Sequence, residues 1–187
     1  MPVKPRVLKR EIVCQSRLFK VEQLELKFSN GEERTYERLL SGNMPAVIIV
    51  PMINENTVLM IREYGAGIDG YELALPKGRV ERGEDILDAA NRELMEEVGY
   101  GAKKLKLIKC MTQSPGYMQH KTQIVLAQDL YPKRLLGDEP EQLDVIEMNI
   151  DDILKIIFQQ DLTEARSIAS LFIVKEIIRN DKLHDKN

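Results

Sequence analysis

Three glutamates stand close together in the middle of the chain, in the segment Arg92-Glu93-Leu94-Met95-Glu96-Glu97. In an α-helix, Glu93 and Glu97 would lie one turn apart on the same face, with Glu96 beside them. Carboxylate oxygens gathered in this way suit a hard divalent cation such as Mg²⁺ or Mn²⁺. An ion there could neutralise a phosphate group and activate water for hydrolysis. The alternative is a solvated acidic helix face, so the cluster needs support from its surroundings.

The surrounding pattern predicts a helix from about Asp85 to Val98. Apolar residues recur at helical spacing and would pack one side of this helix against a core; they are Ile86, Ala90, Leu94 and Val98. Gly99 stands where a left-handed residue commonly ends a helix. Arg92 lies one turn before Glu96 and could pair with it. The glutamates are therefore expected at the margin of a packed surface.

Strand-like segments surround this helix. Apolar patterning predicts strands at residues 10–14, 21–28, 34–40, 46–51, 57–61, 71–75, 105–111, 122–127 and 145–150. Residues 76–83 and 131–142 are predicted loops. Asp151 and Thr163 are predicted to cap two later helices, the second ending near Asn180. The repeated strand–helix units and glycine fingerprint of a dinucleotide-binding fold are missing. The pattern predicts an α/β fold with a mixed β-sheet and an N-terminal antiparallel β segment.

Composition excludes several classes of protein. The 187 residues carry a net charge of −3 with a pI of about 5.6, which disfavours a nucleic-acid binder. The longest apolar run, residues 46–53, is too short to span a membrane. The first residues lack the apolar core of a signal peptide. Cys14 and Cys110 are expected to be free thiols. We expect a cytoplasmic protein with no nucleic-acid or membrane partner.

The segment 78–100 is similar to the Nudix box. That pattern is Gly, five residues, Glu, seven residues, Arg-Glu, an aliphatic residue, any residue, Glu-Glu, any residue, Gly and an aliphatic residue. The chain supplies Gly78, Glu84, Arg92, Glu93, Leu94, Glu96, Glu97 and Gly99, and only Tyr100 departs from the pattern. Seven fixed identities at usages of about 5–7% each give a chance match on the order of 10⁻⁹ per window. The chain therefore resembles the Nudix hydrolase family.

The resemblance implies a Nudix-type α/β/α sandwich with a metal-dependent site. Residues 45–187 would be the Nudix domain, after a break at Ser41-Gly42-Asn43. Residues 1–44 would be a β segment that forms a homodimer. The resemblance makes Glu93 and Glu97 the main ligands of Mg²⁺ or Mn²⁺.

Other parts of the same site also follow from the resemblance. Glu96 would be a further or water-mediated ligand of the metal, and the carbonyl of Lys77 a backbone ligand. Arg92 would orient the glutamates, which a guanidinium can do through its several N–H donors.

Further residues resemble those of the bacterial ADP-compounds hydrolase and ADP-ribose pyrophosphatase subgroup. Arg38 and Arg62 occupy the positions of diphosphate-binding arginines, and Arg38 would serve the partner's site. Pro115 and Tyr117 lie near marker positions of ADP-ribose and diadenosine polyphosphate hydrolases. Glu139 aligns with a catalytic glutamate in a late acidic loop. The alternatives are surface arginines, a common proline turn and a solvated loop.

The function implied is hydrolysis of the diphosphate in ADP-linked compounds. Candidate substrates are ADP-ribose, diadenosine polyphosphates and NADH, with AMP or related products released. A nucleotide-sugar hydrolase of other base or sugar preference is one alternative. A non-catalytic ADP-ribose sensor is another, disfavoured because every box glutamate is kept. The NADH-specific zinc branch is also disfavoured, because the chain has no tryptophan and lacks the four zinc cysteines.

Overall fold

The computed structural model describes residues 2–42 and 45–184, with side chains to residue 180. The strands are β1 (Arg6–Gln15), β2 (Lys20–Lys27), β3 (Glu33–Leu40), β4 (Ala46–Pro51), β5 (Thr57–Gly65), β6 (Gly70–Ala74), β7 (Lys77–Arg79), β8 (Tyr100–Gln113), β9 (His120–Pro132) and β10 (Asp144–Asn149). The helices are α1 (Ile86–Glu93), α2 (Ile153–Ile157) and α3 (Ala165–His184), with a π-helical turn η1 (Leu94–Val98) and a 3₁₀ turn η2 (Ile150–Asp152). The fold is mixed α/β, as the sequence predicts.

The chain divides into two compact units. The first contains residues 1–45 together with 111–122, and the second contains residues 46–110 together with 123–187. The predicted break at residues 41–43 ends at Asn43, which lies outside the described residues, as does Met44 of the predicted boundary.

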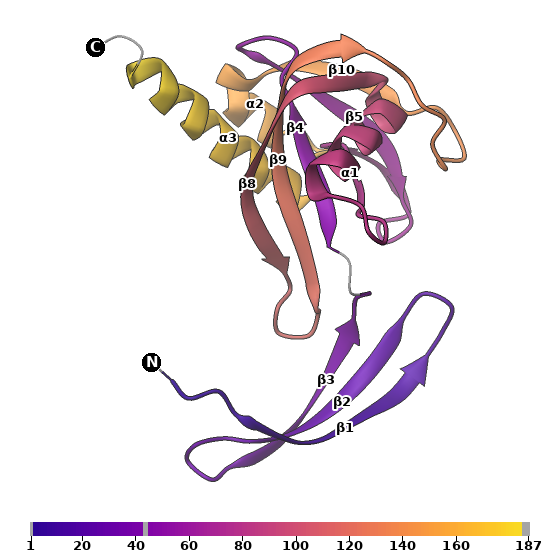
Figure 1. Ribbon diagram of the computed structural model, residues 1–187, viewed down its shortest axis with the longest axis vertical. Coiled ribbons are helices and arrows are strands. Elements are labelled where there is room, and N and C mark those ends of the chain that lie inside the picture. The colour runs from indigo at the N-terminus through magenta and orange to yellow at the C-terminus, as the bar shows by residue number, and fades with distance from the viewer. Residues whose placement is uncertain (1, 43–44, 185–187) are drawn as a thin grey trace. The chain divides into compact units, whose positions relative to one another are not determined.

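The first unit is built on an antiparallel sheet of β1, β2 and β3 (Figure 1). Strand β2 lies in the middle, where Leu24 is 7% exposed. The tip of the β8–β9 hairpin belongs to this unit and pairs with β3. There the N–H of Leu39 donates to the carbonyl of Tyr117 at 2.7 Å, and the N–H of Gln119 donates to the carbonyl of Leu39 at 3.0 Å. The predicted N-terminal antiparallel β segment is confirmed.

The second unit holds the main core. One sheet has the strand order β7-β4-β9-β8, and the other has the order β10-β5-β6. Strand β4 is buried along residues 47–51, and α1 and α3 both pack against it (Figure 1). A continuous apolar strand is expected when both of its faces are covered. The core includes the fully buried side chains of Ile48, Ile49, Leu59, Met60, Ile61, Leu73, Leu94, Ile124 and Leu171.

Two of the sequence-based predictions are wrong in ways that touch the site. The predicted loop 76–83 contains strand β7, which pairs antiparallel with the start of β4. Three residues are too few to show a strand periodicity. The predicted α-helix through Val98 changes at Leu94 into the π-helical turn η1.

The predicted helix caps also differ. The Asn149 side chain, in place of Asp151, accepts the N–H of Asp151 at 2.9 Å. At the start of α3, the Glu164 carboxylate accepts the backbone N–H of Ser167 at 2.8 Å. The hydroxyl of Thr163 instead donates to Glu72. Helix α3 continues to His184, beyond the predicted end at Asn180.

No helix in the described ranges is long and apolar enough to cross a membrane.

Candidate active site

The three glutamates lie where α1 passes into η1. Helix α1 begins after Asp85, whose carboxylate accepts the N–H of Leu87 at 2.8 Å. The next turn, η1, is a π-helical turn, which has one residue more than an α-helical turn. In it the N–H of Gly99 donates to the carbonyl of Leu94, five residues back, at 3.2 Å. Gly99 has a φ of 82°, which confirms the predicted left-handed helix end. Single π turns are frequent at functional sites.

A segment that follows β9 satisfies the carbonyls of this turn. Lys133 donates its backbone N–H to the carbonyl of Gly99 at 3.0 Å. The Arg134 guanidinium donates to the carbonyls of Glu96 and Val98, both at 3.2 Å. A cation at the carbonyl end of a helix is favoured by the helix dipole. The segment therefore stabilises the turn that carries two of the glutamates.

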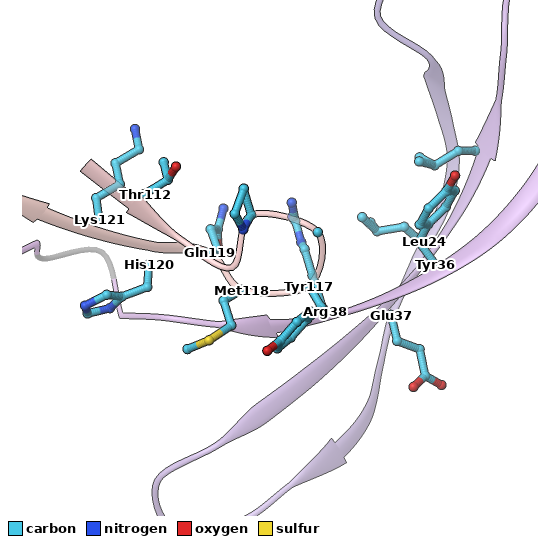
Figure 2. A pocket seen from close by; sticks show the side chains of 13 residues that line it. Leu24, Tyr36, Glu37, Arg38, Thr112, Tyr117, Met118, Gln119, His120 and Lys121 are labelled. Carbon is cyan, nitrogen blue, oxygen red and sulfur yellow. The ribbon is translucent and has the colours of Figure 1, made fainter. Parts of the chain in front are cut away.

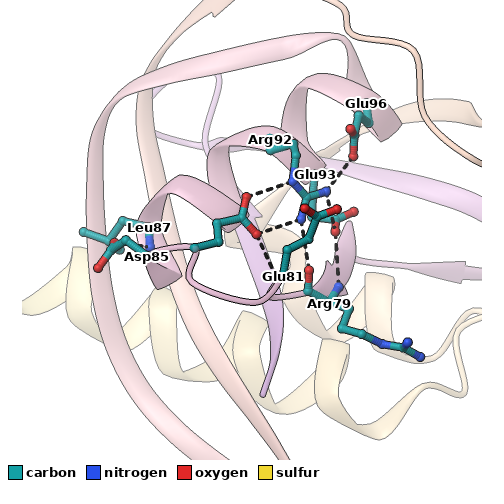
Figure 3. Close-up of polar contacts among 8 residues, drawn as sticks. Arg79, Glu81, Asp85, Leu87, Arg92, Glu93 and Glu96 are labelled. Carbon is teal, nitrogen blue, oxygen red and sulfur yellow. Dashed lines mark hydrogen bonds and ion pairs between the residues drawn. The ribbon is translucent and has the colours of Figure 1, made fainter. Parts of the chain in front are cut away.

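Arg92 lies at the centre of the acidic cluster (Figure 3). Its guanidinium donates to the carboxylates of Glu84, Glu93 and Glu96, each with a contact of 2.9 Å. It also donates to the backbone carbonyl of Arg79 at 3.0 Å. The hydrogen bonds from Arg92 lower the pKa of Glu84. The predicted Arg92–Glu96 pair is confirmed, and Arg92 holds three carboxylates together that would otherwise repel one another.

Glu97 and Glu93 are buried carboxylates, with 4% and 8% of their surface exposed. Glu97 accepts the backbone N–H of Lys77 at 2.9 Å, and Glu93 accepts that of Arg79 at 3.2 Å. Burial raises the pKa of Glu97 to about 9, although the charge of Lys77 opposes this change. Burial raises the pKa of Glu93 to about 7, against the opposing effect of Arg92. A divalent cation beside these groups would favour their charged forms.

Gly78 lets strand β7 pass directly over the cluster. A Cβ at this position would overlap the carboxylate of Glu93. Lys77, the neighbour of Gly78 on β7, adds a further charged contact beside the cluster, because its ammonium pairs with Glu63 of β5. Sequence reasoning did not assign Glu63 a role, since its partner lies in another strand. A residue with a side chain at position 78 would displace Glu93.

The donor set has the right chemistry for a hard divalent cation, because it consists of carboxylate oxygens. In the described part of the chain, no three Asp, Glu, His or Cys side chains are already arranged around a metal position. The guanidinium of Arg92 pairs with both Glu93 and Glu96 at 2.9 Å. Arg92 bonds Oε1 of Glu93 and Oε2 of Glu96, so a metal would be held through the second oxygen of each carboxylate. The predicted ligand set of Glu93, Glu96, Glu97 and the Lys77 carbonyl stays a prediction.

Three of the four predicted substrate-binding residues line one hollow of about 500 Å³ in the first unit (Figure 2). They are Arg38, Pro115 and Tyr117, and Tyr36 lines the same hollow. The Arg38 guanidinium pairs with the buried carboxylate of Glu22 at 2.6 Å. This pair orients the Arg38 guanidinium, which lines the hollow together with Tyr36 and Tyr117.

The fourth predicted substrate-binding residue, Arg62, lies in the second unit on β5. It pairs with Asp161 at 2.5 Å.

Glu139 lies in the loop 133–143 of the second unit. A Cβ at position 137 would overlap the Glu139 carboxylate and would lie 3.3 Å from the Cβ of Glu96. The structure therefore brings Glu139 close to Glu96 of η1.

Comparisons with known proteins identify the family of this chain. Residues 5–38 match the NudE-type Nudix hydrolase N-terminal domain, and residues 42–169 match the NUDIX domain. The chain is 45% identical to the ADP compounds hydrolase NudE of Escherichia coli over 94% of each chain. It is 31% identical to an ADP-ribose pyrophosphatase of Bacillus subtilis, covering 79% of this chain and 78% of the relative. A crystal structure of an ADP compounds hydrolase superposes with a TM-score of 0.91, at 43% identity and 97% coverage of both chains. The chain belongs to the Nudix hydrolase family and begins with an N-terminal domain of the NudE type.

Proposed function

We propose that this Nudix hydrolase cleaves the diphosphate of ADP-linked compounds and releases AMP or related products. The observation that carries the proposal is the set of Glu93, Glu96 and Glu97 on one helix end, two of them buried, with Glu139 beside Glu96. The names of the relatives, an ADP compounds hydrolase and an ADP-ribose pyrophosphatase, support the choice of substrate class.

Nudix hydrolases generally need divalent metal ions. We propose that Mg²⁺ or Mn²⁺ is held by Glu93 and Glu97, with Glu96 and the carbonyl of Lys77 as further ligands. Such an ion neutralises the diphosphate and lowers the pKa of the attacking water. Arg92 offsets part of the acidic charge and keeps the carboxylates of Glu93 and Glu96 within reach of each other.

The positively charged and aromatic residues fit an ADP moiety. The forked guanidinium groups of Arg38 and Arg62 match a phosphate with two hydrogen bonds. Tyr117 and Pro115 line the hollow at Arg38 and are proposed to contact the substrate there. Glu139 is proposed to position or deprotonate the attacking water. A homodimer in which Arg38 serves the partner's site, and a cytoplasmic location, stay predictions.

A hydrolysis screen tests this function. The purified protein is incubated with ADP-ribose, diadenosine polyphosphates, NADH and UDP-sugars, each with Mg²⁺ or Mn²⁺, and the products are identified. We expect AMP from at least one ADP compound and much slower turnover of UDP-sugars. Preferred cleavage of UDP-sugars would favour the nucleotide-sugar alternative. Tight binding of ADP-ribose without any product would favour the sensor.

A further inference from the structure

The loop 133–143 is fixed at its start by the end of the helix. Leu135 donates its backbone N–H to the carbonyl of Met95 at 3.1 Å, next to the two Arg134 contacts described above. These bonds hold residues 133–135 against η1. They leave residues 136–143 to be placed by other contacts.

A second anchor lies near the other end of the loop. The hydroxyl of Tyr71, on β6, donates to Oε1 of Glu141 at 2.5 Å. The Tyr71 ring packs edge-on against Tyr64 of β5, with a centroid distance of 5.6 Å and an interplanar angle of 68°. The two tyrosines are also direct partners in the β5–β6 register. The paired strands β5 and β6 therefore hold the Tyr71 ring, and the Tyr71 hydroxyl holds the loop through Glu141.

Glu139 lies between these two anchors. It is two residues before Glu141 and is separated from it by Pro140, whose ring restricts the backbone. Because Pro140 stiffens this link, a contact that holds Glu141 also limits where Glu139 can lie. The side chain of Glu139 folds back on Gly137, which is next to Glu96.

We propose that Tyr71 is a positioning residue for the hydrolysis reaction: through Glu141 it holds the segment 136–140 so that Glu139 stays beside the glutamates of η1. Tyr71 acts on the loop and does not touch the substrate. The inference rests on the proposed function, because it matters to catalysis only if Glu139 acts on the attacking water.

Tyr71→Phe and Tyr64→Phe form a matched pair of variants. Each removes one phenol hydroxyl that is bonded to a carboxylate and keeps the aromatic pair. The hydroxyl of Tyr64 donates to Asp69 at 2.7 Å, in the turn between β5 and β6, and not to the loop. Since one hydrogen bond changes an equilibrium by roughly threefold to tenfold, we expect Tyr71→Phe to lower kcat by about that factor with KM little changed. Tyr64→Phe should keep the kcat of the parent.

Hydrogen exchange gives a readout that does not depend on activity. In Tyr71→Phe, the backbone amides of residues 136–142 should exchange faster than in the parent, whereas Tyr64→Phe should leave them unchanged. Glu141→Ala should act like Tyr71→Phe, and the double variant should lose no more activity than either single variant. Equal kcat values for Tyr71→Phe and Tyr64→Phe would overturn the inference, whether or not exchange changes.

Glu139→Gln distinguishes a failure of the proposed catalytic role of Glu139 from a failure of the positioning role of Tyr71. If the parent hydrolyses none of the tested substrates, or if Glu139→Gln is as active as the parent, the proposed role of Glu139 fails and the role of Tyr71 in catalysis fails with it. If Glu139→Gln is inactive while Tyr71→Phe keeps full kcat and normal exchange, only the positioning role of Tyr71 is rejected.

Discussion

The carboxylate of Glu97 is held in a position where its charge is unfavourable without a cation. It is 4% exposed, and burial raises its pKa to about 9. One backbone N–H, from Lys77, is the hydrogen bond that it accepts in the structure as described. Glu93 is buried in the same way, but Arg92 compensates part of its charge. A bound divalent cation would remove this cost, which makes Glu97 the residue on which metal binding should depend most.

We predict that Glu97→Gln lowers kcat by at least about 100-fold while the protein stays folded. Glutamine keeps the shape and the hydrogen-bond acceptor but removes the charge that would hold the metal. In the presence of a chelator, the variant should unfold at the same or a higher temperature than the parent, because glutamine has no carboxylate that folding must desolvate or protonate. The control is Glu147→Gln, at an exposed position on β10. Turnover of Glu97→Gln within threefold of the parent at saturating Mg²⁺ would reject the metal assignment.

At the scale of elements, the π-helical turn η1 links the helix of glutamates to the loop of Glu139. The helix ends at Val98, so its last carbonyls have no partners within the helix, and the Arg134 guanidinium bonds those of Glu96 and Val98. Gly99 makes room for that guanidinium, because a Cβ there would lie 2.7 Å from Nη2 of Arg134. The turn therefore depends on the glycine twice, through its positive φ and through this close approach.

We predict that Gly99→Ala destabilises the protein more than Gly83→Ala. Both glycines have positive φ values, of 82° and 87°, so both variants carry a backbone strain of about 1–2 kcal/mol. A Cβ at Gly83 would meet no atom within 4 Å, whereas one at Gly99 would displace Arg134. Urea unfolding should show the difference, and Gly99→Ala should also lose activity. Equal unfolding free energies would mean that Arg134 moves aside without cost.

The start of helix α3 gives a prediction about acid stability. Burial alone would raise the pKa of Glu164, but the hydrogen bond and charge of Arg166 and the hydrogen bonds of Ser167 lower it below 4.5 overall. A carboxyl whose folded pKa is lowered adds stability above its unfolded pKa, and this contribution is lost as the pH falls through the folded value. Glu164 therefore stabilises the folded state at neutral pH.

Glu164→Gln should lower the thermal midpoint at pH 7, and the difference from the parent should shrink below about pH 4.5. Thermal unfolding followed by circular dichroism across this range is the measurement. The control is Glu176→Gln on the same helix, because the Glu176 side chain is 58% exposed. A difference that stays constant down to pH 3 would show that the helix start does not depend on the Glu164 charge.

At the scale of the whole molecule, the chain places its predicted functional residues in two compact units. Arg38, Pro115 and Tyr117 belong to the first, whereas Arg62, Glu139 and the glutamate cluster belong to the second. We predict that residues 1–44 form a dimer and that Arg38 serves the partner's site. Each complete site would then take residues from two chains, which would explain why they lie in separate units.

We predict that light scattering gives about twice the chain mass of 21.5 kDa.

A complementation experiment then tests the shared site, with Arg38→Ala and Glu97→Gln chains expressed together. In a mixed dimer one site would contain both defects and the other neither, so random pairing should restore roughly a quarter of the parent activity. Each variant alone should stay inactive. Without recovery in the mixture, Arg38 does not act across a dimer.

The sequence alone determined the local features of this protein, because they depend on residues close together in the chain. The spacing of Glu93, Glu96 and Glu97, the helix start at Asp85 and the left-handed Gly99 all follow from contacts within a few residues. The same holds for the strands with clear patterning, such as residues 46–51, whose bounds match β4. The resemblance to the Nudix box is local in the same way, because all of its residues lie within positions 78–100.

Only the tertiary structure decided which distant residues support the glutamates. The Arg134 side chain reaches a carbonyl 38 positions earlier, and the Tyr71 hydroxyl reaches a carboxylate 70 positions later. The π turn belongs with these, because Arg134 of a separate segment bonds the carbonyls at its end. Contacts of this kind leave no periodic pattern in the sequence, since they form only when the core brings β6, α1 and the loop after β9 together.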